Sequence, residues 1–163
     1  MKQELVPPQQ KRTEPVVGIN IFSGADTELG AALTNPTELA RQKGRLSKRY
    51  SLTFAGKLYS EVEQAYHVLA TERADKHAKD RDALMIELIA AKFMQHSDLF
   101  EQVKERGGAE FLQACSHWTQ ARTPGSQSWE GQGLESRFIR NLVAGYCLAE
   151  SGDLTQNQQR ALF

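Results

Sequence analysis

A predicted helix from Asp82 to Gln95 places the strongest constraint on the fold of this 163-residue chain. Its apolar residues recur at helical spacing and cover more than one face: Leu84, Met85, Leu88, Ile89, Ala91 and Phe93. A helix that is apolar on most sides is covered by other elements of the fold. The sequence therefore predicts a domain with this helix at its centre.

Two other segments are predicted to be helices with apolar faces. The first begins at Ser60, which forms an S-x-x-E capping box with Glu63, and its apolar face is Val62, Ala65, Tyr66 and Leu69. The second runs from about Leu134 to Glu150, and its core stripe is Leu134, Phe138, Ile139, Leu142, Val143, Tyr146 and Cys147. Both faces suit packing against a central helix.

Shorter elements are predicted between these helices. Apolar and β-branched residues indicate strands at Val16–Phe22 and Tyr50–Phe54, the latter followed by a turn at Ala55–Lys57. Short helices are predicted at Glu28–Leu33, Ser97–Arg106 (with Ser97 as the cap) and Glu110–Cys115. The segment Ser116–Gly133 is predicted to be a long loop, and loops of this length are often functional.

The predicted fold class is mainly α, of the α+β kind: a compact helical domain with short N-terminal β-strands, spanning residues 16–150. A domain of this size buries about two thirds of its unfolded surface, so it needs no disulfide. Residues 1–15 are polar, charged and proline-containing, which is typical of a flexible arm. Residues 151–163 are predicted to form a loose tail.

Charge and cysteine content bound the class of protein. The chain has 20 basic and 20 acidic residues, a balance that gives no sign of a nucleic-acid or membrane protein. Cys115 and Cys147 are too few for a disulfide framework, so we interpret them as reduced thiols of a cytoplasmic protein. No segment reaches the ~18 apolar residues that span a bilayer. The first residues lack the apolar stretch of a signal peptide, and no membrane partner is expected.

Several segments, taken in order, match motifs that one known family combines. Ile21–Gly24 is followed by Leu33–Asn35, and Tyr59–His67 (YSEVEQAYH) is close to that family's SVEQAYQ helix. Ala91–Leu99 (AKFMQHSDL) is similar to its KFxQNPxL stretch, and Trp129–Leu134 (WEGQGL) resembles its tryptophan-glycine turn before the final helix. Together these segments, over about 19–146, resemble the NADAR superfamily of N-glycosidases, and their order and spacing make the resemblance more specific than any one of them.

The resemblance implies a mainly helical hydrolase, similar to divergent bacterial or bacteriophage-type members, that cleaves an N-glycosidic bond in a nucleotide, NAD-related or ADP-ribosyl substrate. No cofactor is expected. The family usually carries a lysine one turn after the tyrosine of its VEQAY helix, implicated in chemistry at the ribose anomeric carbon. The matching position here is Ala70. Lys92 lies in another matched segment, where it is a possible substitute for that lysine, and it is also a candidate substrate-binding residue.

Two carboxylates are candidates for the charge that this chemistry requires. Cleavage of an N-glycoside passes through an oxocarbenium-like state, which a nearby carboxylate stabilises. Glu63 is the candidate catalytic carboxylate, although the capping box alone explains a glutamate there. Glu130, in the glycine-rich loop, is a candidate for substrate binding, and a solvated loop residue is the alternative.

Three further residues complete the predicted site. Trp129 can stack on a base or sugar, or can be a buried anchor of the long loop. Asn35 can bind ribose hydroxyls, or can be a plain turn residue before Pro36. His117 is the second catalytic candidate, because imidazole exchanges protons near neutral pH, and a loop histidine without such a role is the alternative. We expect Asn35, His117 and Trp129 to meet Glu63 in one pocket, because the matched segments have no local reason to recur together.

Other chemistries have less support in the sequence. No metal site is expected, because the cysteines and histidines share no ligand spacing. One dense basic cluster fits the phosphates of a dinucleotide or of a nucleic-acid strand, or a solvated loop: Arg41, Lys43, Arg45, Lys48 and Arg49. Three functions stay open: an N-glycosidase, a non-catalytic binder of nucleotides or ADP-ribose, and a small nucleic-acid-associated protein.

Overall fold

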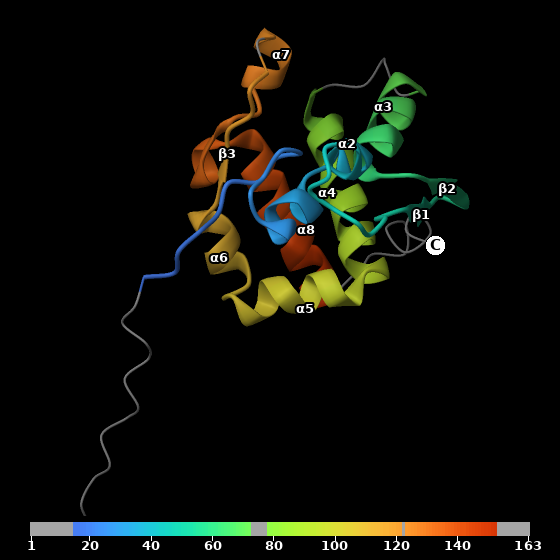
Figure 1. Ribbon diagram of the computed structural model, residues 1–163. Coiled ribbons are helices and arrows are strands. Elements are labelled where there is room, and N and C mark those ends of the chain that lie inside the picture. The colour runs from blue at the N-terminus through green and yellow to red at the C-terminus, as the bar shows by residue number, and fades with distance from the viewer. Residues whose placement is uncertain (1–14, 73–77, 122, 153–163) are drawn as a thin grey trace, which may run out of the picture.

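The computed structural model describes residues 15–72, 78–121 and 123–152. These residues form a mainly helical α+β domain with short strands, as the sequence predicted (Figure 1). The predicted arm before Pro15 and the predicted tail beyond Gly152 lie outside the described residues. No helix in the described part of the chain combines the length and apolar character that a membrane crossing requires.

Two long helices pack side by side at the centre of the domain. They are α4 (Ala78–Gln95) and α8 (Arg137–Ser151), and α3 (Val62–Glu72) also packs against α4 (Figure 1). Leu88 of α4 is fully buried, so the central position predicted for this helix is confirmed. The close approach of the pair requires Gly145 of α8, since a Cβ atom there would lie 2.5 Å from the Ile89 Cγ2 atom.

The N-terminal part of the domain contains two short helices and a hairpin. Helix α1 (Glu28–Leu33) has the predicted bounds, and Thr27 caps it by accepting a hydrogen bond from the Gly30 N–H. Strand β1 (Leu52–Phe54) pairs antiparallel with β2 (Lys57–Tyr59) through a turn in which Ala55 and Gly56 have φ of 51° and 78°. That pair of positive φ values is typical of a tight hairpin turn.

Helix α2 (Thr37–Gln42) was not predicted, because a distant residue stabilises its N-terminus. Pro36 stands at its N-cap and provides no side-chain hydrogen bond. Instead, the Glu61 carboxylate accepts a hydrogen bond of 2.7 Å from the Glu38 N–H. A carboxylate at a helix N-terminus is favourable because it satisfies a free N–H and opposes the helix dipole.

The predicted strand at Val16–Phe22 is wrong, because this extended segment has almost nothing to pair with. Only Asn20 forms a bridge, to Ser116, with hydrogen bonds from the Ile21 N–H to the Ser116 carbonyl and from the Ser116 N–H to the Ile19 carbonyl. Ser116 belongs to β3 (Ser116–His117), which is two residues long and pairs with β4 (Gly131–Gln132).

The rest of the chain closes the domain around α8. Helix α5 (Ser97–Glu105) has Ser97 as its first residue, so the predicted cap is wrong: His96 is the N-cap, with no side-chain hydrogen bond. Helix α6 (Ala109–Ala114) follows. The predicted long loop contains β3, β4 and the short helix α7 (Pro124–Gln127), which projects from the body of the domain (Figure 1). A 3-10 turn, η1 (Gly133–Glu135), leads into α8.

Candidate functional site

A cavity of about 710 Å³ opens between segments that lie far apart in the sequence. Its wall comes from the α1–α2 link, α2, α3, α4, the region of β3 and α7, and the start of α8. Asn35, Glu63, His117 and Trp129 all line it. The size suits a nucleotide, since small-molecule sites occupy roughly 300–1,000 Å³.

Glu63 projects into this cavity from the first turn of α3 and is not part of a capping box. The Ser60 N–H and hydroxyl both donate to the Gln64 side-chain oxygen, at 2.8 and 2.7 Å, so the predicted Ser60–Glu63 box is wrong. Gln64 is one residue further along the helix. Glu63 Oε1 instead lies 2.8 Å from Nε2 of His67, which also lines the cavity. The cap therefore does not explain the Glu63 side chain.

His117 has one ring nitrogen fixed by the backbone. Its Nδ1 lies 2.6 Å from the Ile21 carbonyl oxygen, and a carbonyl oxygen can only accept, so Nδ1 carries the proton. Burial lowers the pKa of His117, although the Ile21 hydrogen bond and the Glu130 and Glu63 carboxylates oppose this shift. A neutral imidazole with the proton on Nδ1 leaves Nε2 as a proton acceptor at neutral pH.

Asn35 joins the wall contributed by the α1–α2 link to the wall contributed by α3. The residue is buried, and its backbone carbonyl accepts hydrogen bonds from the N–H groups of Thr37 (3.0 Å) and Glu63 (3.4 Å). Its side-chain amide donates to the Met85 sulfur of α4 at 3.2 Å. These contacts explain how a turn residue and a helix residue 28 positions further on meet in one cavity.

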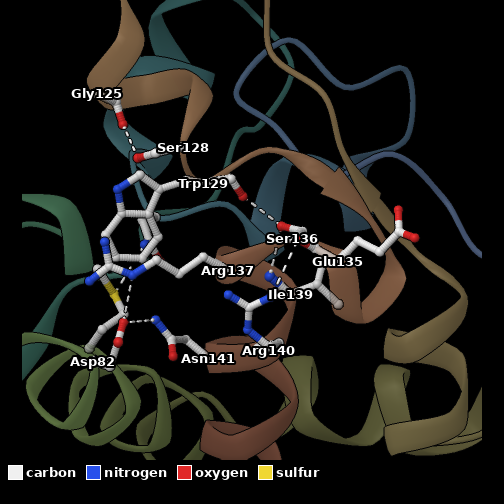
Figure 2. Close-up of polar contacts among 12 residues, drawn as sticks. Asp82, Gly125, Ser128, Trp129, Glu135, Ser136, Arg137, Ile139, Arg140 and Asn141 are labelled. Carbon is white, nitrogen blue, oxygen red and sulfur yellow. Dashed lines mark hydrogen bonds and ion pairs between the residues drawn. The ribbon is translucent and has the colours of Figure 1, made fainter. Parts of the chain in front are cut away.

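Trp129 is held in place by Arg137, as Figure 2 shows. The guanidinium carbon of Arg137 lies 4.0 Å from the Trp129 ring centroid, and its Nε donates to Asp82 Oδ1 at 2.8 Å. The Ser136 hydroxyl donates to the Trp129 carbonyl at 2.6 Å. The Tyr66 ring meets the indole nearly edge-on, at 6.1 Å between centroids. Trp129 thus anchors the long loop and also forms part of the cavity wall.

The other two predicted substrate-binding residues lie outside the cavity lining. Glu130 accepts a hydrogen bond of 3.0 Å from the hydroxyl of Thr119, which does line the cavity. The Lys92 ammonium is buried behind the wall and donates to the carbonyls of Ala32 and Thr34. Burial lowers the pKa of Lys92 to about 7. Lys92 therefore fixes the link that carries Asn35 and has no contact with the cavity space.

Sequence reasoning missed several polar residues of the lining, including Ser23, Tyr66, His67 and Thr119. The spacing of Glu63 and His67 is i,i+4, which places two side chains on one helix face, so this pair was detectable. Ser23 and Thr119 gave no such signal, since tertiary contacts alone bring their segments to the cavity.

Three residues of the predicted basic cluster pair with carboxylates. Arg41 pairs with Glu38 at 2.9 Å, Arg45 with Asp26 at 3.9 Å and Lys48 with Asp98 at 2.6 Å. Of the five cluster residues, Lys43 lines the cavity. These carboxylates offset part of the positive charge that would attract the phosphates of a nucleic-acid strand.

Neither a metal site among the described residues nor a match to a known protein indicates what the cavity binds. The described residues contain no group of three His, Cys, Asp or Glu side chains that could hold a metal ion. In comparisons with known proteins, no family model, no curated protein and no solved structure matches this chain.

Proposed function

We propose that the cavity is the active site of an N-glycosidase that hydrolyses a nucleotide, NAD-related or ADP-ribosyl substrate. The observation that carries the proposal is the presence of a carboxylate, Glu63, and a neutral imidazole, His117, in the wall of one nucleotide-sized cavity. The resemblance of the same segments to the NADAR superfamily supports it.

Glu63 would stabilise the positive charge that develops at the ribose ring as the C–N bond breaks. A carboxylate acts strongly on such charge in a water-poor site. The electron pair of the bond leaves with the base, and a water oxygen bonds to the anomeric carbon. His117 Nε2 would accept the proton that this water loses, because the Ile21 carbonyl keeps the other ring nitrogen protonated.

Other lining residues would hold the two parts of the substrate. Tyr66 and Trp129 offer aromatic surfaces on which a flat base can pack, and base–aromatic stacking contributes roughly 1–3 kcal/mol per base. Asn35, in the α1–α2 link, lines the same cavity, and its side-chain oxygen can accept a hydrogen bond from a ribose hydroxyl.

A non-catalytic nucleotide binder is the second candidate, and Ala70 is the observation that favours it. The NADAR-type lysine would stand at this position, one turn of α3 beyond Tyr66. Ala70 is half-buried, packs against the core and has no ionisable side chain. A binder would retain the aromatic and polar walls of the cavity and would release no base.

The test is a screen of nucleotides, NAD and ADP-ribose for thermal stabilisation, followed by chromatography of each stabilising compound for released base. The proposal predicts both stabilisation and base release. Stabilisation without release would favour the binder, and the Ala70→Lys variant then shows whether that side chain alone was missing. Failure of every nucleotide to stabilise the protein would contradict both candidates.

A further inference from the structure

Lys43 and Ser23 form a polar corner of the cavity that the glycosidase chemistry above does not use. The Lys43 ammonium donates to the Ser23 hydroxyl oxygen at 2.6 Å, and both residues line the cavity. They come from separate segments: Ser23 precedes α1, and Lys43 follows α2. Tertiary packing therefore brings the two groups together.

The charge of Lys43 has no partner in the described part of the chain. Arg41, Arg45 and Lys48 each pair with a carboxylate, whereas Lys43 pairs with none. Among the described residues that line the cavity, Lys43 is the one lysine or arginine. A cation in a concave site raises the local concentration of anionic ligands.

Both groups retain hydrogen-bond donors. An ammonium has three N–H donors, and the Ser23 contact occupies one of them. The Ser23 oxygen accepts in that contact, so its own O–H proton remains available to donate. The Ser23 side chain is buried, which limits competition from bulk water. Such charge-assisted donors match the oxygens of a phosphate group.

We propose that Lys43 and Ser23 are the phosphate subsite of this cavity, so that its ligand is a nucleotide and not a nucleoside. This inference rests on the proposed function for the location of the base and ribose, and it adds the residues that bind the phosphate of the substrate. The phosphate would lie at the Lys43–Ser23 corner, and the base would lie toward Tyr66 and Trp129.

The experiment measures the affinity of nucleosides and their 5′-monophosphates by isothermal titration calorimetry, using adenosine, guanosine, cytidine and uridine as the probe set. In the parent protein at least one monophosphate should bind about 10- to 100-fold more tightly than its nucleoside, as expected for hydrogen bonds to a charged group. Added salt should reduce this preference, because Lys43 is exposed to solvent.

Two variants and a matched control locate the effect. Lys43→Met should remove the preference for phosphate and leave nucleoside affinity unchanged, and Ser23→Ala should reduce the preference by a smaller factor. Lys48→Met, which removes a neighbouring lysine paired with Asp98, should retain the full preference.

Equal affinity for nucleoside and monophosphate, an unchanged preference in Lys43→Met, or no binding of any monophosphate would each overturn the subsite. Because binding affinity and base release are separate measurements, the outcome is separate from that of the glycosidase proposal. A phosphate preference without base release would keep the subsite and contradict the enzyme. Base release without a phosphate preference would support the enzyme and contradict the subsite.

Discussion

Glu63 Oε1 lies 2.8 Å from His67 Nε2, one helical turn further along α3, and both residues line the cavity. The carboxylate is about one third exposed, whereas the imidazole is 70% exposed. The pair therefore places the carboxylate toward the interior and the histidine toward solvent. A carboxylate in this position is fixed by one partner and keeps a second oxygen available to a ligand.

The position of Leu88 at the centre of the core leads to a stability prediction. Leu88→Ala should lower the free energy of unfolding by about 2–5 kcal/mol, because it leaves a cavity in the core. Leu58→Ala on the hairpin is the control, since that side chain is 75% exposed and its loss should cost less than about 0.5 kcal/mol. Urea unfolding measures both, and similar losses would contradict the assignment of the core.

The approach of α4 and α8 at Gly145 can be tested with the smallest possible side chain. In Gly145→Ala the new Cβ would meet the Ile89 side chain at 2.5 Å, so the variant should lose about 1–3 kcal/mol despite the better helix propensity of alanine. Gly125→Ala in α7 meets nothing within 4 Å and should be nearly neutral. A stabilised Gly145→Ala protein would show that the helices lie further apart.

The buried Lys92 predicts a pH dependence of stability. Burial lowers the pKa of Lys92 to about 7, whereas in the unfolded chain it is 10.5. Between these two pH values the unfolded chain binds one more proton than the folded protein. The free energy of unfolding therefore rises with pH, by up to about 1.4 kcal/mol per pH unit. Below pH 7 the ammonium is charged in both states and this gain is absent.

The comparison with Lys92→Met isolates that effect from other titrating groups. The parent protein should gain stability relative to the variant as pH rises from 7 to 9, measured by urea unfolding at several pH values. A constant difference between the two proteins over this range would contradict the lowered pKa.

The lowered pKa of His117 leads to a second prediction about titration. Burial lowers its pKa, so the ring should lose its proton below the ordinary value of 6.5 and be neutral at pH 7. NMR titration of the imidazole C–H signals measures this directly, and the signal that disappears in His117→Asn assigns the residue. A His117 signal that titrates at or above 6.5 would remove the basis for a proton acceptor in the cavity.

Local signals in the sequence were enough to find α1, α4 and α8, since caps and apolar periodicity act within a few turns. These signals did not predict the segments whose conformation depends on a residue far away in the sequence. Helix α2 depends on Glu61 for its N-terminal hydrogen bond, and the segment Val16–Phe22 has strand-like residues but only a bridge to Ser116. For the same reason Ser23 and Lys43 were not recognised as neighbours, because tertiary packing alone joins their segments.

The central claim is that Glu63 stabilises charge during cleavage of an N-glycosidic bond. The most direct measurement is the rate of base release, on the substrate found by the nucleotide screen, in the parent protein and in Glu63→Gln. The variant keeps the shape of the side chain and removes its charge. Glu72→Gln is the control, since Glu72 is exposed on the same helix and lies outside the cavity lining. Glu63→Gln should be ~10²–10³-fold slower with an unchanged melting temperature, and Glu72→Gln should be unaffected. Full activity in Glu63→Gln would contradict the claim.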